Sequence, residues 1–218
     1  MVQIFAPRAN TLSRMALAAL VVVPLTLVAL MCALPFTSFA TDQDLVVHQP
    51  VPFSHEHHVG VIGLDCRYCH AGVEHARYAG LPPTETCMTC HSQLWTGAPM
   101  LAPVRQSLAQ DKPLVWQRVH RLPDYVYFDH SVHVAKGVGC SSCHGAVDRM
   151  PLMRQVAPLT MGWCLDCHRN PGQALRPAAA IFDPEWQPPP DQQAQGAALL
   201  RRYQVHTAGL TDCSVCHR

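Results

Sequence analysis

Five copies of the pattern Cys-x-x-Cys-His constrain this 218-residue chain more than any other feature, and they use ten of its eleven cysteines. The pattern is typical of covalent haem attachment, because two intervening residues let both thiols reach the two vinyl groups while the next residue, histidine, ligates the iron. In chain order, attachment groups one to five are Cys66, Cys69 and His70; Cys87, Cys90 and His91; Cys140, Cys143 and His144; Cys164, Cys167 and His168; and Cys213, Cys216 and His217. The sequence therefore predicts five covalently bound haem c groups.

Two other chemistries use paired cysteines. Structural zinc sites combine C-x-x-C pairs, and redox dithiols carry one C-x-x-C next to a βαβ unit. Neither chemistry requires a histidine directly after the second cysteine, whereas all five copies here have one. The histidine therefore favours haem attachment. The eleventh cysteine, Cys32, lies in an apolar run, and we interpret it as a small apolar residue.

A second repeat supplies histidines for the other side of the iron. Haem iron has two axial positions, and nine of the fourteen histidines lie outside the attachment groups. Stretches beginning at Phe53 and Phe128 share the pattern Phe-x-His-x-x-His-Val, and the second histidine of each precedes an attachment group by seven or eight residues. Residues three apart share one face of a helical turn, so each pair can serve two neighbouring haems. The predicted distal ligands are His55, His58, His130 and His133.

Five haems need a fifth distal ligand. We predict His120, which lies eight residues before Phe128 in a segment that Pro123 and nearby aromatic residues hold on a fixed path. His206 is an alternative, because it precedes Cys213 by the same seven residues that separate His133 from Cys140. Thioether ligation is the third possibility, with the candidates Met150, Met153 and Met161. The histidines interpreted as solvated side chains are His48, His57 and His75.

The spacing of the groups also predicts the fold class. About 36 residues per haem follow the N-terminal apolar run, and chains below about 40 residues rarely build a sufficient core unaided. We expect a mostly irregular chain with short α-helices wrapped around stacked haems, and little or no sheet. The four-haem region 41–172 holds two repeated modules, 53–91 and 128–168, and a short helix is predicted from Pro103. A Pro/Ala/Gln-rich extended linker at 173–205 leads to the fifth attachment segment at 206–218.

An apolar run near the N-terminus predicts a membrane anchor. Met15 to Phe36 contains no charge, and 22 residues of helix span about 33 Å, enough for the hydrocarbon core. Arg8 and Arg14 precede the run, which predicts a cytoplasmic tail at 1–14 and a transmembrane helix at 15–37. The small residues that end at Ala40 leave a signal peptide as the alternative. Both alternatives place the haem region on the periplasmic side; a retained helix makes the chain a single-pass protein of the inner membrane.

Charge and ligation narrow the class of function. Without Arg8 and Arg14 the chain has 14 basic and 15 acidic side chains, and five haems with their propionates bring the formal charge to about −6. This excludes a nucleic-acid partner and predicts basic surfaces on docking proteins. Haems with two protein ligands exchange electrons but offer no open position to a substrate. We therefore expect an electron relay without a catalytic site; the alternatives are a free-standing periplasmic multihaem carrier and a multihaem oxyanion reductase.

The stretches PVPFSHEHHVGVIGLDCRYCH, FDHSVHVAKGVGCSSCHG and MGWCLDCHRNP resemble the pentahaem cytochrome c subunit of alternative complex III, a multihaem cytochrome of the c7 and c3 type. The resemblance covers residues 50 to 172, and the N-terminal anchor and the final TDCSVCHR also match its layout. It implies electron transfer from a quinol-oxidising membrane complex to a cytochrome c or terminal oxidase. It also implies partners: an iron–sulfur subunit, polytopic quinol-binding membrane subunits, and a monohaem cytochrome c or a terminal oxidase.

Overall fold

The computed structural model describes residues 5–217, so the first four residues of the expected cytoplasmic tail lie outside the described residues. The chain divides into two compact units between Asp42 and Gln43. The first unit contains the apolar N-terminal run, and the second contains all five attachment groups. The functional site is therefore built entirely within the second unit.

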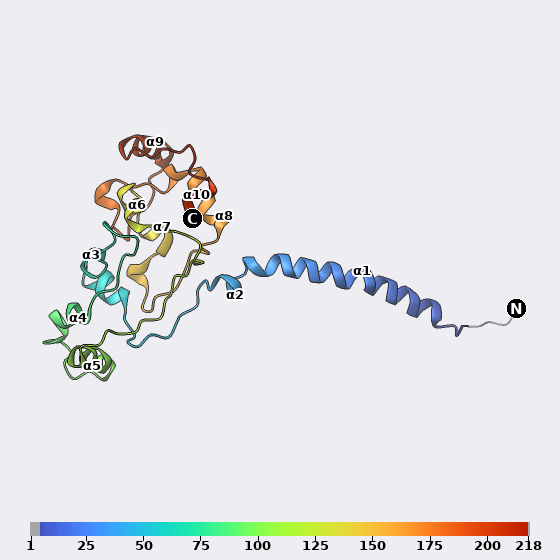
Figure 1. The fold of residues 1–218 in the computed structure, drawn as a ribbon, viewed down its shortest axis with the longest axis horizontal. Helices are drawn as coiled ribbons and strands as arrows, with labels where there is room; N and C mark the ends of the chain where they lie inside the picture. The colour runs from blue at the N-terminus through green and yellow to red at the C-terminus, as the bar shows by residue number, and fades with distance from the viewer. Residues whose placement is uncertain (1–4, 218) are drawn as a thin grey trace. The chain divides into compact units, whose positions relative to one another are not determined.

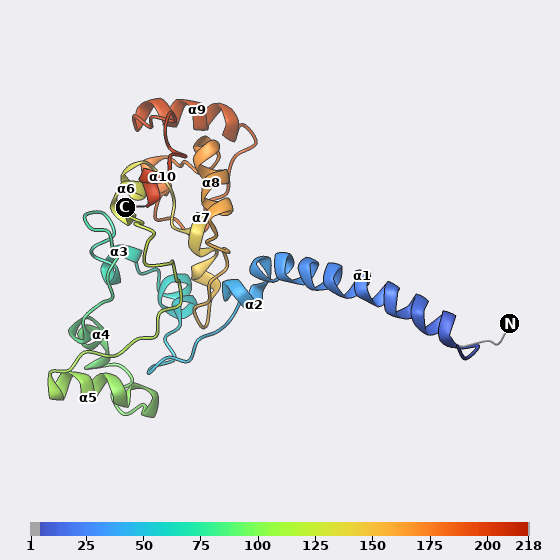
Figure 2. The same cartoon turned by 45° about the vertical axis from the view of Figure 1, so that its right-hand side comes forward.

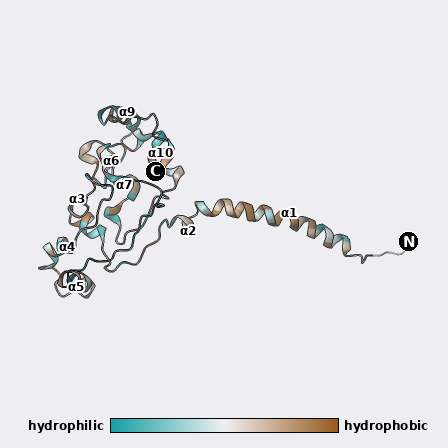
Figure 3. Cartoon of the chain, viewed as in Figure 1, coloured by the Kyte–Doolittle hydropathy of each residue, from teal (hydrophilic) through white to brown (hydrophobic). Residues whose placement is uncertain are grey.

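The first unit is dominated by one long helix, α1, at Ala9–Ala33 (Figure 1). A 3-10 turn, η1 (Leu34–Phe36), and a short helix, α2 (Ser38–Thr41), follow it. The helix begins six residues before the expected start at 15 and continues through Pro24. The stretch Ala9–Phe36 is long and apolar enough to cross a membrane, as its hydropathy colouring in Figure 3 illustrates. None of the residues of α1 is buried. By length and composition, this stretch could form the anchor that the sequence predicts.

The second unit consists of short helical elements joined by irregular segments (Figures 1 and 2). They are η2 (Glu56–Val61), α3 (Cys66–Cys69), α4 (Thr84–His91), η3 (Pro99–Leu101), α5 (Ala102–Gln110), α6 (His130–Ala135), α7 (Ser141–His144), η4 (Val147–Arg149), α8 (Met161–Arg169), η5 (Pro171–Gln173), η6 (Ala178–Ala180), α9 (Gln192–Arg202) and α10 (Cys213–Cys216). Residues 5–217 contain no sheet, only isolated bridges such as that between Val126 and His217. The predicted fold class is confirmed.

The helix predicted from Pro103 is present as α5. Proline occupies the first turn, where its missing N–H costs no hydrogen bond, and the helix ends at Asp111, whose φ of 51° is left-handed. Val51, Leu101 and Val104 form a buried apolar cluster at this helix. A second cluster of three buried residues joins Val73, Val134 and Ile181. Both clusters are small, so hydrogen bonds from polar side chains contribute much of what holds the loops in place.

The prediction of an extended linker at 173–205 is wrong over its second half, where the helix α9 (Gln192–Arg202) forms. Alanine, glutamine and leucine are good helix formers, and they dominate the segment from Gln192. The buried Gln192 side chain donates to the carbonyls of Gly172 and Leu175, both at 3.0 Å. A Cβ atom on Gly196 would overlap the Gly172 carbonyl, so a glycine is needed where α9 packs against η5. The helix is thus fastened to the segment that follows the fourth attachment group.

Candidate haem-binding sites

Each attachment group lies on one helical turn. The first and fifth groups form the short helices α3 and α10, the third begins at the N-terminus of α7, and the second and fourth lie within α4 and α8. Residues three apart share a helix face, so both thiols of a group lie on one side of its turn. N-terminal caps fix two of the turns: Asp65 accepts from Arg67 N at 2.8 Å and Thr160 Oγ1 accepts from Trp163 N at 3.4 Å.

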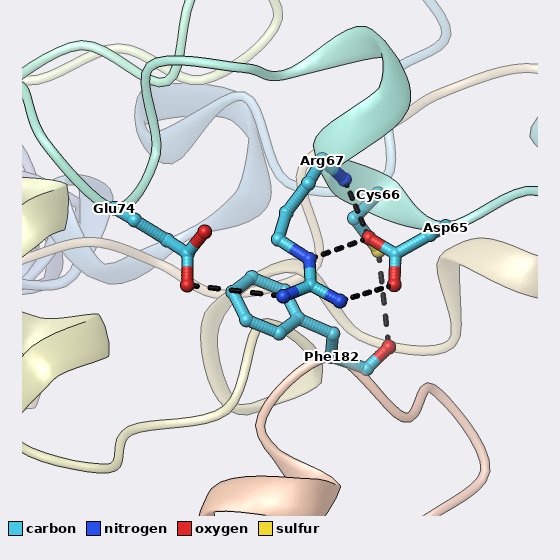
Figure 4. A network of polar contacts seen from close by, with 5 residues as sticks. All are labelled: Asp65, Cys66, Arg67, Glu74 and Phe182. Atoms are coloured by element: carbon cyan, nitrogen blue, oxygen red, sulfur yellow. Dashed lines mark hydrogen bonds and ion pairs between the residues drawn. The ribbon is translucent and has the colours of Figure 1, made fainter.

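The first group is held by a polar network that Figure 4 draws from close by. The Arg67 guanidinium donates to both carboxylate oxygens of Asp65 at 2.8 Å and lies 3.9 Å from a carboxylate oxygen of Glu74. The same guanidinium lies 4.3 Å from the centroid of the Phe182 ring. The hydrogen bond from Arg67 holds the pKa of Asp65 below its usual range. The network orients the turn that carries Cys66, whose thiol lies 3.9 Å from the Phe182 carbonyl oxygen.

Eight of the ten attachment cysteines are half-buried, Cys90 and Cys213 are exposed, and none of the ten thiols forms a disulfide. A hydrogen bond with Cys140 lowers the pKa of Cys66 to about 7, and burial raises the pKa of Cys143 to about 12. A structural zinc site brings four ligands to one ion. In the described part of the chain, no three or more Cys, His, Asp or Glu side chains gather in that way.

The histidine that ends each group has its Nδ1 atom engaged. Four of these atoms lie within hydrogen-bond distance of backbone carbonyls: His70 and Gly80 (2.7 Å), His91 and Leu94 (3.2 Å), His168 and Leu210 (2.8 Å), and His217 and Tyr125 (3.2 Å). The fifth, Nδ1 of His144, lies 3.1 Å from Nε2 of His120. Metal-binding histidines commonly donate one ring N–H in this way, which fixes the tautomer and leaves the other nitrogen for the metal. In all five rings it is therefore Nδ1 that makes the hydrogen bond, and Nε2 is the nitrogen that would bind a metal.

The two Phe-x-His-x-x-His stretches have the same three-dimensional arrangement. Phe53 stacks on His58 with ring centroids 4.4 Å apart, and Phe128 stacks on His133 at 4.5 Å. In each stretch the phenylalanine also meets the first histidine edge to face, at 4.9 Å from His55 and 4.8 Å from His130. The phenylalanine of the repeat is thus a spacer that holds both imidazoles.

Backbone carbonyls again fix the distal rings. The Nδ1 atoms of His58, His130 and His133 lie 2.7 to 2.8 Å from the carbonyls of Ser54, Arg77 and Asp129. Asp129 also caps the helix α6, because its carboxylate accepts from the backbone of the first turn. The capping carboxylate orients the helix that carries the pair.

Three of the predicted distal histidines face an attachment histidine across the gap that a haem iron would fill. The ring centroids lie 6.2 Å apart for His58 and His91, 6.3 Å for His130 and His144, and 6.2 Å for His133 and His168. Metal–nitrogen bonds to imidazole are about 2 Å long, so two axial rings on one metal have centroids roughly 6 Å apart. The residues present therefore fit bis-histidine haem.

The remaining distal candidate, His55, lies in the electrostatic neighbourhood of His70. Burial, followed by the charges of His70 and His58, lowers the pKa of His55 to about 4, and its Nδ1 atom is buried without a hydrogen-bond partner among the described residues. Burial likewise lowers the pKa of His144 to about 3, with His120 and His130 as the next causes. The imidazoles are thus kept neutral at physiological pH, which is the form that binds a metal.

Contacts between groups give their order in space. Tyr68 of the first group lies 2.9 Å from Thr89 of the second, hydroxyl to hydroxyl. The first and third groups share one support, since the Cys66 thiol contacts the carbonyl of Phe182 and the Cys140 amide donates to that of Ile181 at 3.2 Å. The pair on α6 faces the third and fourth groups, and His168 of the fourth contacts the segment before the fifth. These contacts link the groups in the order second, first, third, fourth, fifth.

The structure places the candidates for the fifth distal ligand in different surroundings. His120 lies against His144, with ring centroids 4.3 Å apart. The ring of His217 lies next to that of Tyr125, with centroids 5.6 Å apart. The other candidates range from the buried Met150 through Met153 to the exposed Met161 and His206. His48, His57 and His75 are exposed, in agreement with their interpretation as solvated side chains.

A buried arginine supports the third group, and the sequence analysis missed it. Arg176 is 3% exposed and its guanidinium donates to Ser141 Oγ at 2.6 Å and to the Asp183 carbonyl at 3.1 Å. It also lies 4.5 Å from the centroid of the Trp186 ring. A Cβ atom on Gly139 would overlap the guanidinium, so the glycine before Cys140 leaves room for it. No local pattern links residues this far apart, whereas the cap Asp129 could have been found from its place directly before His130.

Comparison with known proteins agrees with this geometry. No protein-family model matches the chain. The chain is 35% identical over 125 residues to the multihaem cytochrome c subunit of menaquinone reductase from Nitratidesulfovibrio vulgaris. The matched region covers 56% of this chain and 59% of that relative, so it spans less than two thirds of the relative's length. The similarity supports a multihaem cytochrome c.

Proposed function

We propose that this chain is a membrane-anchored pentahaem cytochrome c that relays electrons between a quinone-linked membrane complex and a second redox protein. The observation that carries the proposal is the set of histidine pairs with ring centroids 6.2 to 6.3 Å apart, each joining an attachment histidine to a histidine of a Phe-x-His-x-x-His stretch. When bound, a haem with two such ligands exchanges one electron and presents no open coordination position to a substrate. A relay therefore suits this chain better than oxyanion reduction.

The chain's own residues would hold, orient and shield the cofactors. The ten cysteines of the attachment groups would form the thioether bonds, and the histidine ending each group would be the proximal ligand. Backbone carbonyls at Nδ1 keep most of these rings in the tautomer whose Nε2 atom binds iron. The proposed distal and proximal pairs are His55 with His70, His58 with His91, His130 with His144, and His133 with His168.

The direction of transfer has two candidates. The resemblance to the subunit of alternative complex III supports quinol oxidation on a polytopic partner, with an iron–sulfur subunit in the complex and a monohaem cytochrome c or terminal oxidase as acceptor. The relative's name, menaquinone reductase, supports the opposite direction, in which electrons from this chain reach a quinone. A row of attachment groups in contact with one another serves either direction, because reactions of the quinone would take place on another subunit.

The anchor is proposed to be α1, in the inner membrane with the second unit in the periplasm. Its apolar length and the preceding Arg8 and Arg14 support this orientation. Carbonate-washed membranes should retain the protein. Recovery of a mature chain that begins near Thr41 in the soluble periplasm would overturn the anchor and favour a free-standing carrier.

The haem proposal is tested by mass spectrometry of the intact chain, purified in mild detergent from a host that matures c-type cytochromes. We expect the mass of five haems on the wild type and of four on a Cys213→Ala, Cys216→Ala variant. Cys32→Ser is the matched control, because Cys32 lies in α1 and outside every attachment group, and it should keep five. A wild-type chain without covalent haem would contradict the proposal.

The partner proposal is tested in the same preparation. An iron–sulfur protein and polytopic membrane proteins should copurify, and anaerobic addition of a menaquinol should reduce the haems if the chain accepts electrons from a quinol. If the haems, once reduced, are instead oxidised by menaquinone and not reduced by menaquinol, the opposite direction holds. A chain that always purifies alone would contradict membership of a complex.

A further inference from the structure

We propose that His120 is a positioning residue that accepts a hydrogen bond from the proximal ligand His144 and thereby lowers the reduction potential of the haem at the third attachment group. This inference rests on the proposed function, because it needs haem at that group. It replaces the expectation that His120 is the fifth axial ligand. It also makes the third group the one whose proximal hydrogen bond is controlled by a side chain.

The geometry divides the two nitrogens of His144 between two neighbours. Nδ1 lies 3.1 Å from Nε2 of His120, and the two rings meet edge to face at 81°. The ring of His130 has its centroid 6.3 Å from that of His144, and its plane is tilted by only 6°. His130 is at the separation of a second axial ligand, whereas His120 is at the separation of a direct hydrogen bond. His144 Nε2 is then free for iron.

The other four attachment histidines differ from His144 in the nature of their partner. Each of them has its Nδ1 atom next to a backbone carbonyl, which no substitution can remove. An imidazole nitrogen is a strong acceptor that a single substitution deletes. Removal of the side chain at 120 should therefore change one haem of the five and leave the other proximal hydrogen bonds intact.

His120 is held where an acceptor is needed. The backbone amide of the next residue, Arg121, donates to Oε1 of Gln155 at 3.4 Å, and Gln155 is only 2% exposed. A neutral imidazole has one unprotonated nitrogen, and here that nitrogen is Nε2 facing His144. With Nε2 so engaged, the ring offers no lone pair on that atom to a second metal.

The expected effect follows from the electronics of the ligand. A proximal histidine that donates its N–H to a good acceptor becomes more basic, which stabilises ferric iron over ferrous iron. Loss of the acceptor should raise the potential of this haem. Outer-shell partners of metal ligands typically change metal binding by tenfold or more. A tenfold change in the equilibrium constant for reduction corresponds to about 59 mV for a one-electron couple.

The test uses the full-length holoprotein in three variants: His120→Leu, His120→Gln and His75→Leu. Leucine removes the acceptor, glutamine restores one through its amide oxygen but is no substitute for a haem ligand, and the exposed His75 is the control. Haem content is first counted by mass, so that a failure of haem binding is separated from a failure of this inference. Spectroelectrochemical titration then gives the five potentials, and carbon monoxide added to the ferrous protein reports any open iron.

We expect His120→Leu to raise one potential by about 59 mV, while the spin state and carbon monoxide binding of every haem stay as in the wild type. His120→Gln should recover most of the shift, and His75→Leu should have none. A high-spin haem that binds carbon monoxide in the glutamine variant would identify His120 as an axial ligand and overturn the inference. Five unchanged potentials in His120→Leu would overturn it as well; if that variant does not accumulate, the glutamine variant alone decides the ligand question.

Discussion

Replacement of Arg176 by methionine should destabilise the second unit by about 3 kcal/mol. The guanidinium makes two short hydrogen bonds, to Ser141 Oγ at 2.6 Å and to the Asp183 carbonyl at 3.1 Å. A hydrogen bond to a charged group contributes about 1.5–3 kcal/mol, and a desolvated cation over an aromatic ring contributes about 2 kcal/mol, here from Trp186 at 4.5 Å. Burial lowers the pKa of Arg176, so the cost of removing its charge from water offsets part of this sum. Methionine fills most of the volume but leaves the Asp183 carbonyl without its donor.

The assay is thermal unfolding of the holoprotein followed by far-ultraviolet circular dichroism. For a unit of this size, about 3 kcal/mol lowers Tm by roughly 6 to 12 °C. The matched control is Arg169→Met, since the Arg169 side chain is 60% exposed and its ion pair with the exposed Asp166 contributes less than about 1 kcal/mol. Equal Tm values for the two variants would refute the reasoning, because the buried guanidinium would then contribute no more than an exposed one.

Three further changes have defined outcomes. Gly196→Leu should destabilise the protein by about 1–3 kcal/mol in thermal unfolding, because its Cβ overlaps a backbone carbonyl, whereas Gly162→Ala, which meets nothing within 4 Å, should be neutral or stabilising; equal effects would contradict the close packing of α9. Asp129→Ala removes the cap of α6 and should cost about 1 kcal/mol, measured as faster amide hydrogen exchange in that helix; unchanged exchange would show that the cap is dispensable. His58→Ala should leave one of the haems high-spin and able to bind carbon monoxide, and a fully low-spin spectrum would exclude His58 as a ligand.

The features that the sequence predicted well are those whose chemistry is local. A Cys-x-x-Cys-His group carries its spacing within five residues, and each was recovered as a helical turn. The pairs at His55 and at His130 could be read from a repeat, and the same repeat holds the phenylalanine that stacks on each second histidine. The helix from Pro103 could be predicted because proline is common in the first turn of a helix.

What could not be predicted depends on contacts between distant segments. The ring of His120 lies against that of His144, which is 24 residues away, and no spacing rule could predict this contact. The Arg176 side chain donates hydrogen bonds to Ser142 and Ser141, which lie 34 and 35 positions earlier in the chain. The helix α9 was hidden by the prolines before it, which suggested an extended path although the residues from Gln192 favour a helix. Composition averaged over a long window masked that change.

The shared support of the first and third attachment groups affects how the protein is made. A secreted chain leaves the membrane with its N-terminal side first, and Cys66 emerges 116 residues before Phe182, whose carbonyl its thiol contacts in the folded protein. On the proposed function, the enzymes that join haem to the first group would therefore meet an open chain, in which the thiols are accessible. Contacts between residues so distant in sequence form slowly. If the chain is secreted and carries haem as proposed, this contact forms only after Phe182 has been secreted, which gives the thiols of the first group time to react before the structure closes over them.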